Sequence, residues 1–182
     1  GWAAQDFVWK SGQKMKVVCD TTEAPVVKVA LDLLKRDCRS VLSGEISRSE
    51  NTGNIYVGTW GESSVLQALA ETHQLDVAQL NEHKEAFLLN VLPDGRLVVA
   101  GSDKRGTAYG VLELSRMMGV SPWEWWADAV PEKKEEFRLP AGFRKLDYPQ
   151  VAYRGIFIND EDWGLTPWSW KHYEPSERKG QI

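Results

Sequence analysis

The order of apolar runs and helical stripes constrains the fold of this chain more than any other feature. Residues 15–20 form a short apolar run, with Met15, Val17 and Cys19 predicted on one face of a strand. The following stretch has apolar residues at one-turn intervals, as a helix packed on a sheet requires: Val27, Leu31, Leu34 and Cys38. Pro25 favours a helix start at that position. This order predicts a strand followed by a helix lying against it.

The same order returns further along the chain. Residues 55–59 read as a second strand, and a helix is predicted from Ser63 or Ser64 to about His73. Residues 86–91 and 97–100 flank the turn sequence Pro-Asp-Gly-Arg and therefore predict a hairpin. A hairpin within a set of strand-to-helix units makes the expected sheet mixed rather than purely parallel.

A last helix is predicted over residues 107–118, closed by Gly119. The helical period places Glu113 and Arg116 on the outer face, and it turns the following residues inward: Ala108, Val111, Leu112, Ser115 and Met118. Residues 132–150 are richer in charge and proline, which indicates an edge strand and a linker. We therefore expect an α/β domain with helices packed on a mixed sheet over residues 1–148, and a second region over residues 149–182.

Composition excludes several classes of function. The net charge of -4, with basic residues scattered along the chain, gives no footprint for nucleic acid. No apolar run approaches the roughly 20 residues that span a bilayer, so membrane insertion is not expected. Two cysteines and three histidines without ligand spacing predict neither a metal site nor a disulfide framework. We expect no cofactor, and we place Cys19 and Cys38 in the core, although a disulfide between them stays open.

The strongest functional signal lies where an apolar strand meets a group of carboxylates. Residues 151–158 end in a run without polar alternation, as in strands buried on both faces. Directly after it come Asn159, Asp160, Glu161, Asp162 and Trp163. At the end of a barrel strand such carboxylates act as acid, base or ligand, and a Trp offers an apolar face to a ligand. The alternative is a solvated acidic turn that caps a helix.

Two other motifs have simpler readings. The loop from Gly101 to Thr107 has the glycine spacing of a phosphate-binding loop, but Thr107 stands where that loop needs lysine. A tight turn, in which Gly101 and Gly106 supply backbone freedom and Asp103 or Thr107 caps the helix, is the better interpretation. Trp residues are concentrated between positions 123 and 170. They indicate either packing between domains or a platform for sugar rings.

Three runs of the sequence resemble glycoside hydrolase family 115: residues 101–110, 114–123 and 153–163. The resemblance covers roughly residues 13–170. Members of that family are xylan α-1,2-glucuronidases, which remove glucuronic acid or its 4-O-methyl ether with inversion. The resemblance implies an N-terminal α/β domain similar to the accessory domain of hexosaminidases, followed by a (β/α)8 barrel of which this chain holds the first strand.

In these terms Asp160 and Glu161 are the candidate catalytic residues, and Asn159, Asp162 and Trp163 are the candidate substrate-binding residues. No acid or base role is assigned to either carboxylate. The resemblance implies a xylan or glucuronoxylan oligosaccharide as partner and a secreted or periplasmic location, with this chain alone inactive. The alternative is a non-catalytic carbohydrate-binding or structural domain. The sequence leaves open whether the full-length enzyme is a homodimer.

Overall fold

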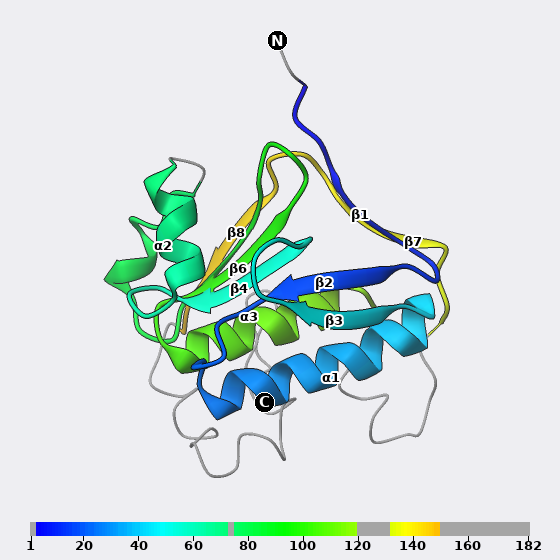
Figure 1. Ribbon diagram of the computed structural model, residues 1–182, viewed down its shortest axis with the longest axis horizontal. Helices are drawn as coiled ribbons and strands as arrows, with labels where there is room; N and C mark the ends of the chain where they lie inside the picture. Colours follow the sequence, from blue (N-terminus) through cyan, green and yellow to red (C-terminus); the bar gives the residue numbers. More distant parts are fainter. Residues whose placement is uncertain (1–2, 73–74, 120–131, 150–182) are drawn as a thin grey trace.

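The computed structural model describes residues 3–72, 75–119 and 132–149, which form an α/β domain built on a mixed sheet (Figure 1). The main sheet has six strands in the order β3-β2-β4-β6-β5-β8. Their bounds are β2 (Lys14–Val18), β3 (Glu45–Ser49), β4 (Ile55–Thr59), β5 (Phe87–Val91), β6 (Leu97–Gly101) and β8 (Arg144–Asp147). Strands β3, β2, β4 and β6 are parallel, whereas β5 is antiparallel to both of its neighbours. The predicted mixed sheet and the hairpin of β5 and β6 are confirmed.

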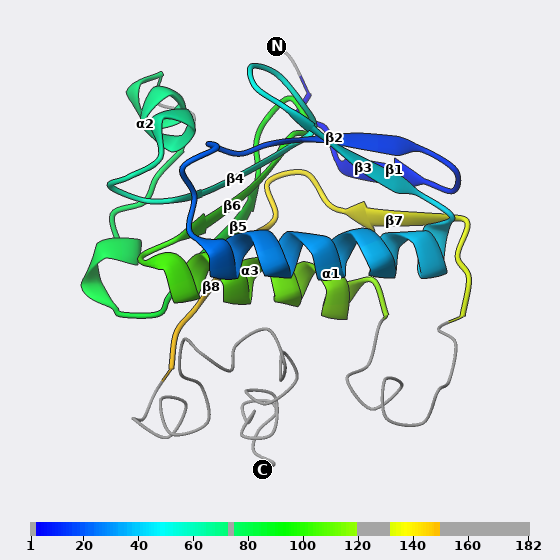
Figure 2. The same cartoon turned by 60° about the horizontal axis from the view of Figure 1, so that its bottom comes forward.

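Helices cover both faces of this sheet. The helices α1 (Pro25–Leu42) and α3 (Lys104–Met117) lie side by side on one face, as Figure 2 shows, and α2 (Ser64–Glu71) lies on the other. A short 3-10 helix, η1 (Leu80–Glu82), contributes to the core on the α2 side. The predicted helices are confirmed, with α3 starting at Lys104 rather than Thr107. Among the described residues, no helix combines the length and the hydropathy needed to cross a membrane.

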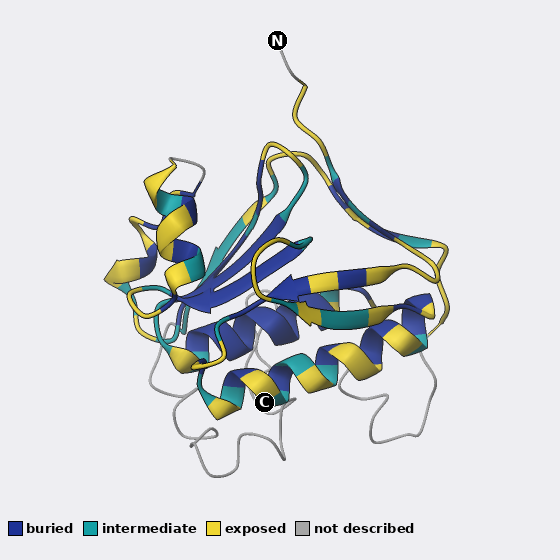
Figure 3. Ribbon diagram, in the orientation of Figure 1, coloured by how far each residue is buried: buried dark blue, intermediate teal, exposed yellow. Residues whose placement is uncertain are grey.

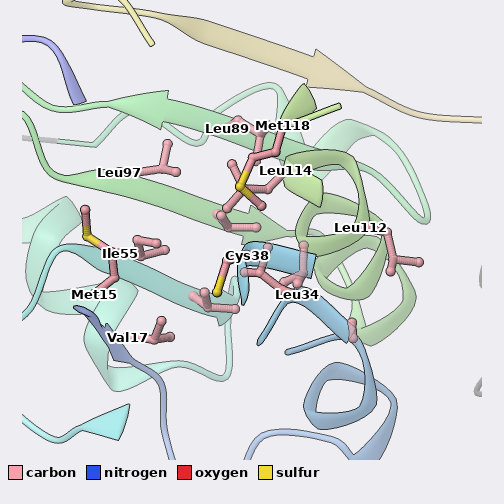
Figure 4. Packing of buried hydrophobic residues seen from close by; sticks show 14 of the residues in the cluster. Met15, Val17, Leu34, Cys38, Ile55, Leu89, Leu97, Leu112, Leu114 and Met118 are labelled. Atoms are coloured by element: carbon pink, nitrogen blue, oxygen red, sulfur yellow. The ribbon is translucent and has the colours of Figure 1, made fainter. Parts of the chain in front are cut away.

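The side chains of the strands pack into two separate cores, one on each face of the main sheet, because successive side chains along a strand point to opposite faces. Val17 packs in the core under α1 and α3, while Val18 packs in the core under α2. The same division separates Val57 from Tyr56 on β4. Figure 4 shows the first core from nearby, where Cys38 of α1 lies beside strand residues. Burial on both faces explains why these strands carry apolar runs instead of polar alternation.

A small second sheet was not predicted. Strand β1 (Phe7–Lys10) pairs antiparallel with β7 (Glu136–Leu139), so the beginning of the chain lies against a segment far along the sequence. Trp9 of β1 is fully buried, and its indole nitrogen donates a hydrogen bond to the carbonyl oxygen of Gln13 at 3.0 Å. Residues 132–149 therefore supply two strands, β7 and β8, where the sequence predicted one edge strand and a linker.

One predicted orientation on α3 is wrong. Arg116 is exposed as expected, but Glu113 is only 2% exposed. Figure 3 shows the reason, since α3 is buried along nearly all of its length whereas α1 keeps an exposed outer face. A helical period identifies one buried stripe, but it cannot show that other parts of the fold cover the opposite side.

Candidate functional site

The residues that the sequence proposes for chemistry lie outside the described part of the chain. This holds for Asn159, Asp160, Glu161, Asp162 and Trp163, and also for the Trp residues between 123 and 126. The described residues end at Pro149, just after β8. The structure therefore shows which polar side chains of the described domain lie together. It also shows how the domain holds β8, the last described strand before the proposed carboxylates.

Polar side chains of the domain gather at the carboxyl ends of its parallel strands. In open α/β sheets this edge is where ligands commonly bind. Asp20 follows β2, Thr59 ends β4, Asp103 caps the helix that follows β6, and Thr107 lies in the first turn of that helix. Glu23 precedes α1 and joins the same edge. This group is the best candidate site among the residues that the structure describes.

The centre of the group is the buried carboxylate of Glu23, which accepts from Thr59, and Thr59 is in turn hydrogen-bonded to Thr107. Glu23 is 7% exposed, and its Oε2 accepts a hydrogen bond from the Thr59 hydroxyl at 2.8 Å. The Thr59 oxygen lies 2.7 Å from the hydroxyl of Thr107, which is fully buried. The Thr107 hydroxyl also lies 3.0 Å from the carbonyl oxygen of Asp103, so it has acceptors at both Thr59 and the start of its own helix. The three side chains thus tie α1, β4 and α3 together.

Asp20 makes a second set of hydrogen bonds at the same edge of the sheet. Its two carboxylate oxygens accept from the backbone N–H and the hydroxyl of Ser64, both at 2.9 Å. Ser63 caps α2, because its side-chain oxygen accepts from the backbone N–H of Leu66. The carboxylates of Asp20 and Glu23 therefore both have partners within the domain. Such an arrangement holds loops and helices in place rather than presenting an acid and a base to a substrate.

The loop from Gly101 to Thr107 is a capped turn, as the sequence predicted. Asp103 is the cap, and one of its oxygens accepts from the backbone N–H of Gly106 at 2.9 Å. Its other oxygen accepts from the backbone N–H of Glu85 at the same distance. The carboxylate of Asp103 thus occupies the N-terminus of α3, where a phosphate-binding loop would receive its anion.

The two glycines of this loop serve a different purpose from the one expected. The sequence interpretation gave Gly101 and Gly106 a need for backbone freedom, but neither adopts a positive φ. Instead, a Cβ at Gly106 would lie 2.0 Å from the carbonyl oxygen of Ala86, and a Cβ at Gly101 would lie 2.0 Å from the backbone nitrogen of Thr107. These positions require glycine because the backbone of α3 approaches its neighbours so closely.

A buried ion pair near the end of the domain was missed by the sequence interpretation. Glu113 of α3 accepts from Arg116 at 2.6 Å and from Lys145 of β8 at 2.7 Å. Burial alone would raise the pKa of Glu113, but the hydrogen bonds and charges of Arg116 and Lys145 outweigh it and lower the pKa to about 2. Glu113 is therefore ionised and joins α3 to the last described strand. No local pattern marks Glu113, since its second partner comes from a distant segment.

The two cysteines belong to the core. Cys19 and Cys38 are both buried and neither is in a disulfide. Burial, with Glu23 and Asp20 nearby, raises the pKa of Cys19 to about 12, and burial raises the pKa of Cys38 to about 11. A thiol is an effective nucleophile only as the thiolate, so neither is suited to chemistry. Among the described residues, no group of three or more His, Cys, Asp or Glu side chains could hold a metal ion.

Comparisons with known proteins identify related chains. The family model described as glycosyl hydrolase family 115 matches residues 146–181. The solved structure of BtGH115A, a family GH115 4-O-methyl-α-glucuronidase with specificity for decorated arabinogalactans, is 54% identical with a TM-score of 0.75. That similarity covers 96% of this chain but 22% of BtGH115A, so the chain spans about a fifth of the relative's length. A comparison with curated proteins finds no match.

More distant structures share the fold alone. A mutant β-hexosaminidase of Streptomyces plicatus is 17% identical with a TM-score of 0.53, and the similarity covers 85% of this chain and 25% of the hexosaminidase. The structure of CpGH84D is 15% identical with the same TM-score, covering 80% of this chain and 22% of that protein. The likeness to hexosaminidases that the sequence implied is thus seen in the fold.

Proposed function

Because the chain belongs to glycosyl hydrolase family 115, we propose that it is the N-terminal part of an α-glucuronidase. The enzyme would remove glucuronic acid, or its 4-O-methyl ether, from a plant polysaccharide with inversion. The observation that carries this proposal is the 54% identity to BtGH115A over 96% of the chain. We also propose that the domain is followed by a (β/α)8 barrel, as the resemblance of the sequence implies.

The polysaccharide is the finer part of the proposal. The sequence interpretation favoured glucuronoxylan, whereas BtGH115A is specific for decorated arabinogalactans. Both polymers present a terminal glucuronate, so the same sugar would enter the pocket in either case. We propose the glucuronate side chain as the recognised group. Since such polymers lie outside cells, we also propose a secreted or periplasmic enzyme.

In the proposed enzyme Asp160 and Glu161 take part in catalysis, and Asn159, Asp162 and Trp163 bind the sugar. Inversion needs an acid and a base separated by roughly 6.5 to 9.5 Å, with a water molecule between them. Neighbouring carboxylates on one strand end do not supply the acid, the base and a uronate pocket together. We therefore propose that the chain alone is inactive. Its share of BtGH115A, 22% of the length, supports this view.

The test is turnover in the full-length enzyme. Asp160→Asn and Glu161→Gln are expected to lower release of glucuronate from at least one of the two polymers by about 100-fold or more, the low end for loss of an acid or base. Glu50→Gln is the control, because the Glu50 side chain is 76% exposed on the domain surface. Release should be measured from glucuronoxylan and from arabinogalactan in parallel. Near-normal turnover in both variants would show that the acidic cluster is a solvated turn without a role in catalysis.

A non-catalytic role of the domain is the second candidate. The closed hydrogen-bond network around Glu23 and Thr59 favours a domain that supports its neighbour rather than one that binds sugar. Calorimetric titration of the chain with xylan and arabinogalactan oligosaccharides separates these roles. No measurable heat of binding is expected. Binding by the chain alone would make it a carbohydrate-binding module.

A further inference from the structure

Strand β8 is the last described element before the region in which the proposed chemistry lies. The match to the family 115 model begins at residue 146, inside β8, and the predicted strand that precedes Asp160 starts only a few residues later. Among the described strands, β8 is also at the edge of the main sheet, where it pairs with β5. Its position therefore determines where the following chain starts.

Side chains fasten β8 on both faces of the sheet. Lys145 points to the α3 side, where its ammonium group lies 2.7 Å from Oε2 of Glu113. Arg144 lies on the opposite side, and its guanidinium donates to the carbonyl oxygen of Asp76 at 3.1 Å. Leu146 on that same side packs against the α2 core. These contacts follow the alternation of a strand, so each depends on the register of β8.

The fastening continues beyond the strand. The ring of Tyr148 stacks on the imidazole of His83, with centroids 3.5 Å apart and planes 5° from parallel. His83 follows η1, which is held in the α2 core by the fully buried Leu80. The chain is thus tied to the domain up to Tyr148. A slip of β8 by one residue would turn Lys145 away from Glu113 and break the Tyr148 stack.

The charge of Glu113 would be compensated without Lys145. Arg116 already pairs with that carboxylate from the same helix, at 2.6 Å. Lys145 adds a second cation that comes from β8, and its side chain is one-third exposed. Such a cross-link favours one register of the strand, because a shift by one residue would move Lys145 to the other face. The Glu113–Lys145 pair is therefore suited to fixing the position of the strand.

We propose that Lys145 and His83 are positioning residues for the glycosidase reaction. They hold β8 in one register and so fix the starting point of the segment that carries Asp160 and Glu161. This inference rests on the proposed function. Displacement of a reacting group by about 1 Å can cost on the order of 100-fold in rate, so a loosened β8 should be visible in turnover.

The first experiment replaces Lys145 in the full-length enzyme. Lys145→Met keeps the aliphatic stem and leaves Glu113 paired with Arg116, so the domain should fold. We expect kcat to fall by about 10-fold or more with KM within about 2-fold, and Lys145→Arg to restore most of it. The matched control is Lys133→Met, because the Lys133 ammonium donates its hydrogen bonds to Ser40 and Ser43 at the C-terminal end of α1.

The second experiment replaces His83. His83→Ala removes the stack on Tyr148 and is expected to lower kcat in the same way, whereas His83→Phe keeps an aromatic ring and should retain activity. Thermal unfolding of each variant separates positioning from stability. The proposal expects a loss of kcat in Lys145→Met and His83→Ala without a matching loss in Lys133→Met at a similar melting temperature.

Hydrogen exchange supplies a readout that does not depend on activity. Amides of residues 144–148 should exchange faster in Lys145→Met and His83→Ala, while those of β4 should not change. If the full-length enzyme is active and kcat is unchanged in both Lys145→Met and His83→Ala, the positioning role is overturned and the proposed function is not. Loss of kcat that simply follows melting temperature in all variants, Lys133→Met included, would overturn it too. A full-length protein that releases no glucuronate would overturn the proposed function and this inference together.

Discussion

Lys145 on the edge strand reaches Glu113 on α3, and their charged atoms lie 2.7 Å apart around a carboxylate whose side chain is only 3% exposed. A buried charge in this fold therefore joins the helix layer to the last described strand. Removing Glu113 would leave both cations without this partner, whereas removing Lys145 would leave the carboxylate paired with Arg116. The contact consequently bears on both stability and the path of the chain.

Glu113 should make the stability of the domain depend on acidic pH. Its folded pKa of about 2 lies below the ordinary 4.5, so its contribution is present above about pH 4.5 and is lost as pH falls toward 2. We expect Glu113→Gln to lower the free energy of unfolding at pH 7 by on the order of 3 kcal/mol. Urea unfolding at several pH values should show this gap narrowing below pH 4.5. A constant gap, or an equal effect of the exposed Glu62→Gln, would contradict the assignment.

Thr59→Val should expose the dependence of Glu23 on its hydroxyl partner. The variant keeps the shape of the side chain but leaves a buried carboxylate short of a donor, which costs about 1 to 3 kcal/mol. Thr59→Ser should lose less, because the hydroxyl is retained. Thr21→Val, at an exposed position, is the control and should change stability by no more than about 0.5 kcal/mol. Equal costs at Thr59 and Thr21 would show that the network contributes nothing.

Gly106→Ala should be far more damaging than Gly61→Ala. The added methyl at Gly106 meets backbone 2.0 Å away, whereas at Gly61 it meets open space and only the positive φ of 95° opposes it. A left-handed conformation costs a residue with a Cβ roughly 1 to 2 kcal/mol. Yield of folded protein and the urea midpoint are the measurements. A cost at Gly106 no larger than that at Gly61 would refute the close approach of α3 to Ala86.

Neither cysteine should react in the folded domain. With the pKa of Cys19 raised to about 12 and that of Cys38 to about 11, almost no thiolate is present at pH 8, and both sulfurs are buried. Ellman's reagent should label no thiol in native protein and both thiols in guanidinium. Rapid labelling of native protein would disprove this burial, and no labelling after denaturation would indicate a disulfide.

The secondary structure that could be predicted is the part governed by neighbouring residues. Pro25 and the stripe from Val27 to Cys38 predicted α1, and the Pro-Asp-Gly-Arg turn predicted the hairpin of β5 and β6. Strands β1 and β3 were missed because they are short and β3 is polar, so neither carries a local pattern strong enough to reveal it. Pairing with distant segments makes them strands.

The residues of the candidate site could likewise be predicted only in part. The acidic run from Asn159 to Trp163 could be singled out from the sequence, and its part in catalysis stays a prediction because those residues lie outside the described chain. The network of Glu23, Thr59 and Thr107 could not be predicted, since its members are separated by 36 and 48 positions. The domain boundary at residue 148 likewise stays a prediction.

By itself the sequence determined the helices, the hairpin, the mixed sheet and the resemblance to family 115, because helical period, turn residues and motif identity are properties of adjacent positions. Only the tertiary structure decided that Glu113 is buried and that Gly106 must lack a side chain. It also decided that Lys145 of β8 meets Glu113 and that His83 stacks on Tyr148, just after this strand. The physical reason is that burial, close backbone approach and ion pairing depend on which distant segments meet, and chain topology sets those meetings.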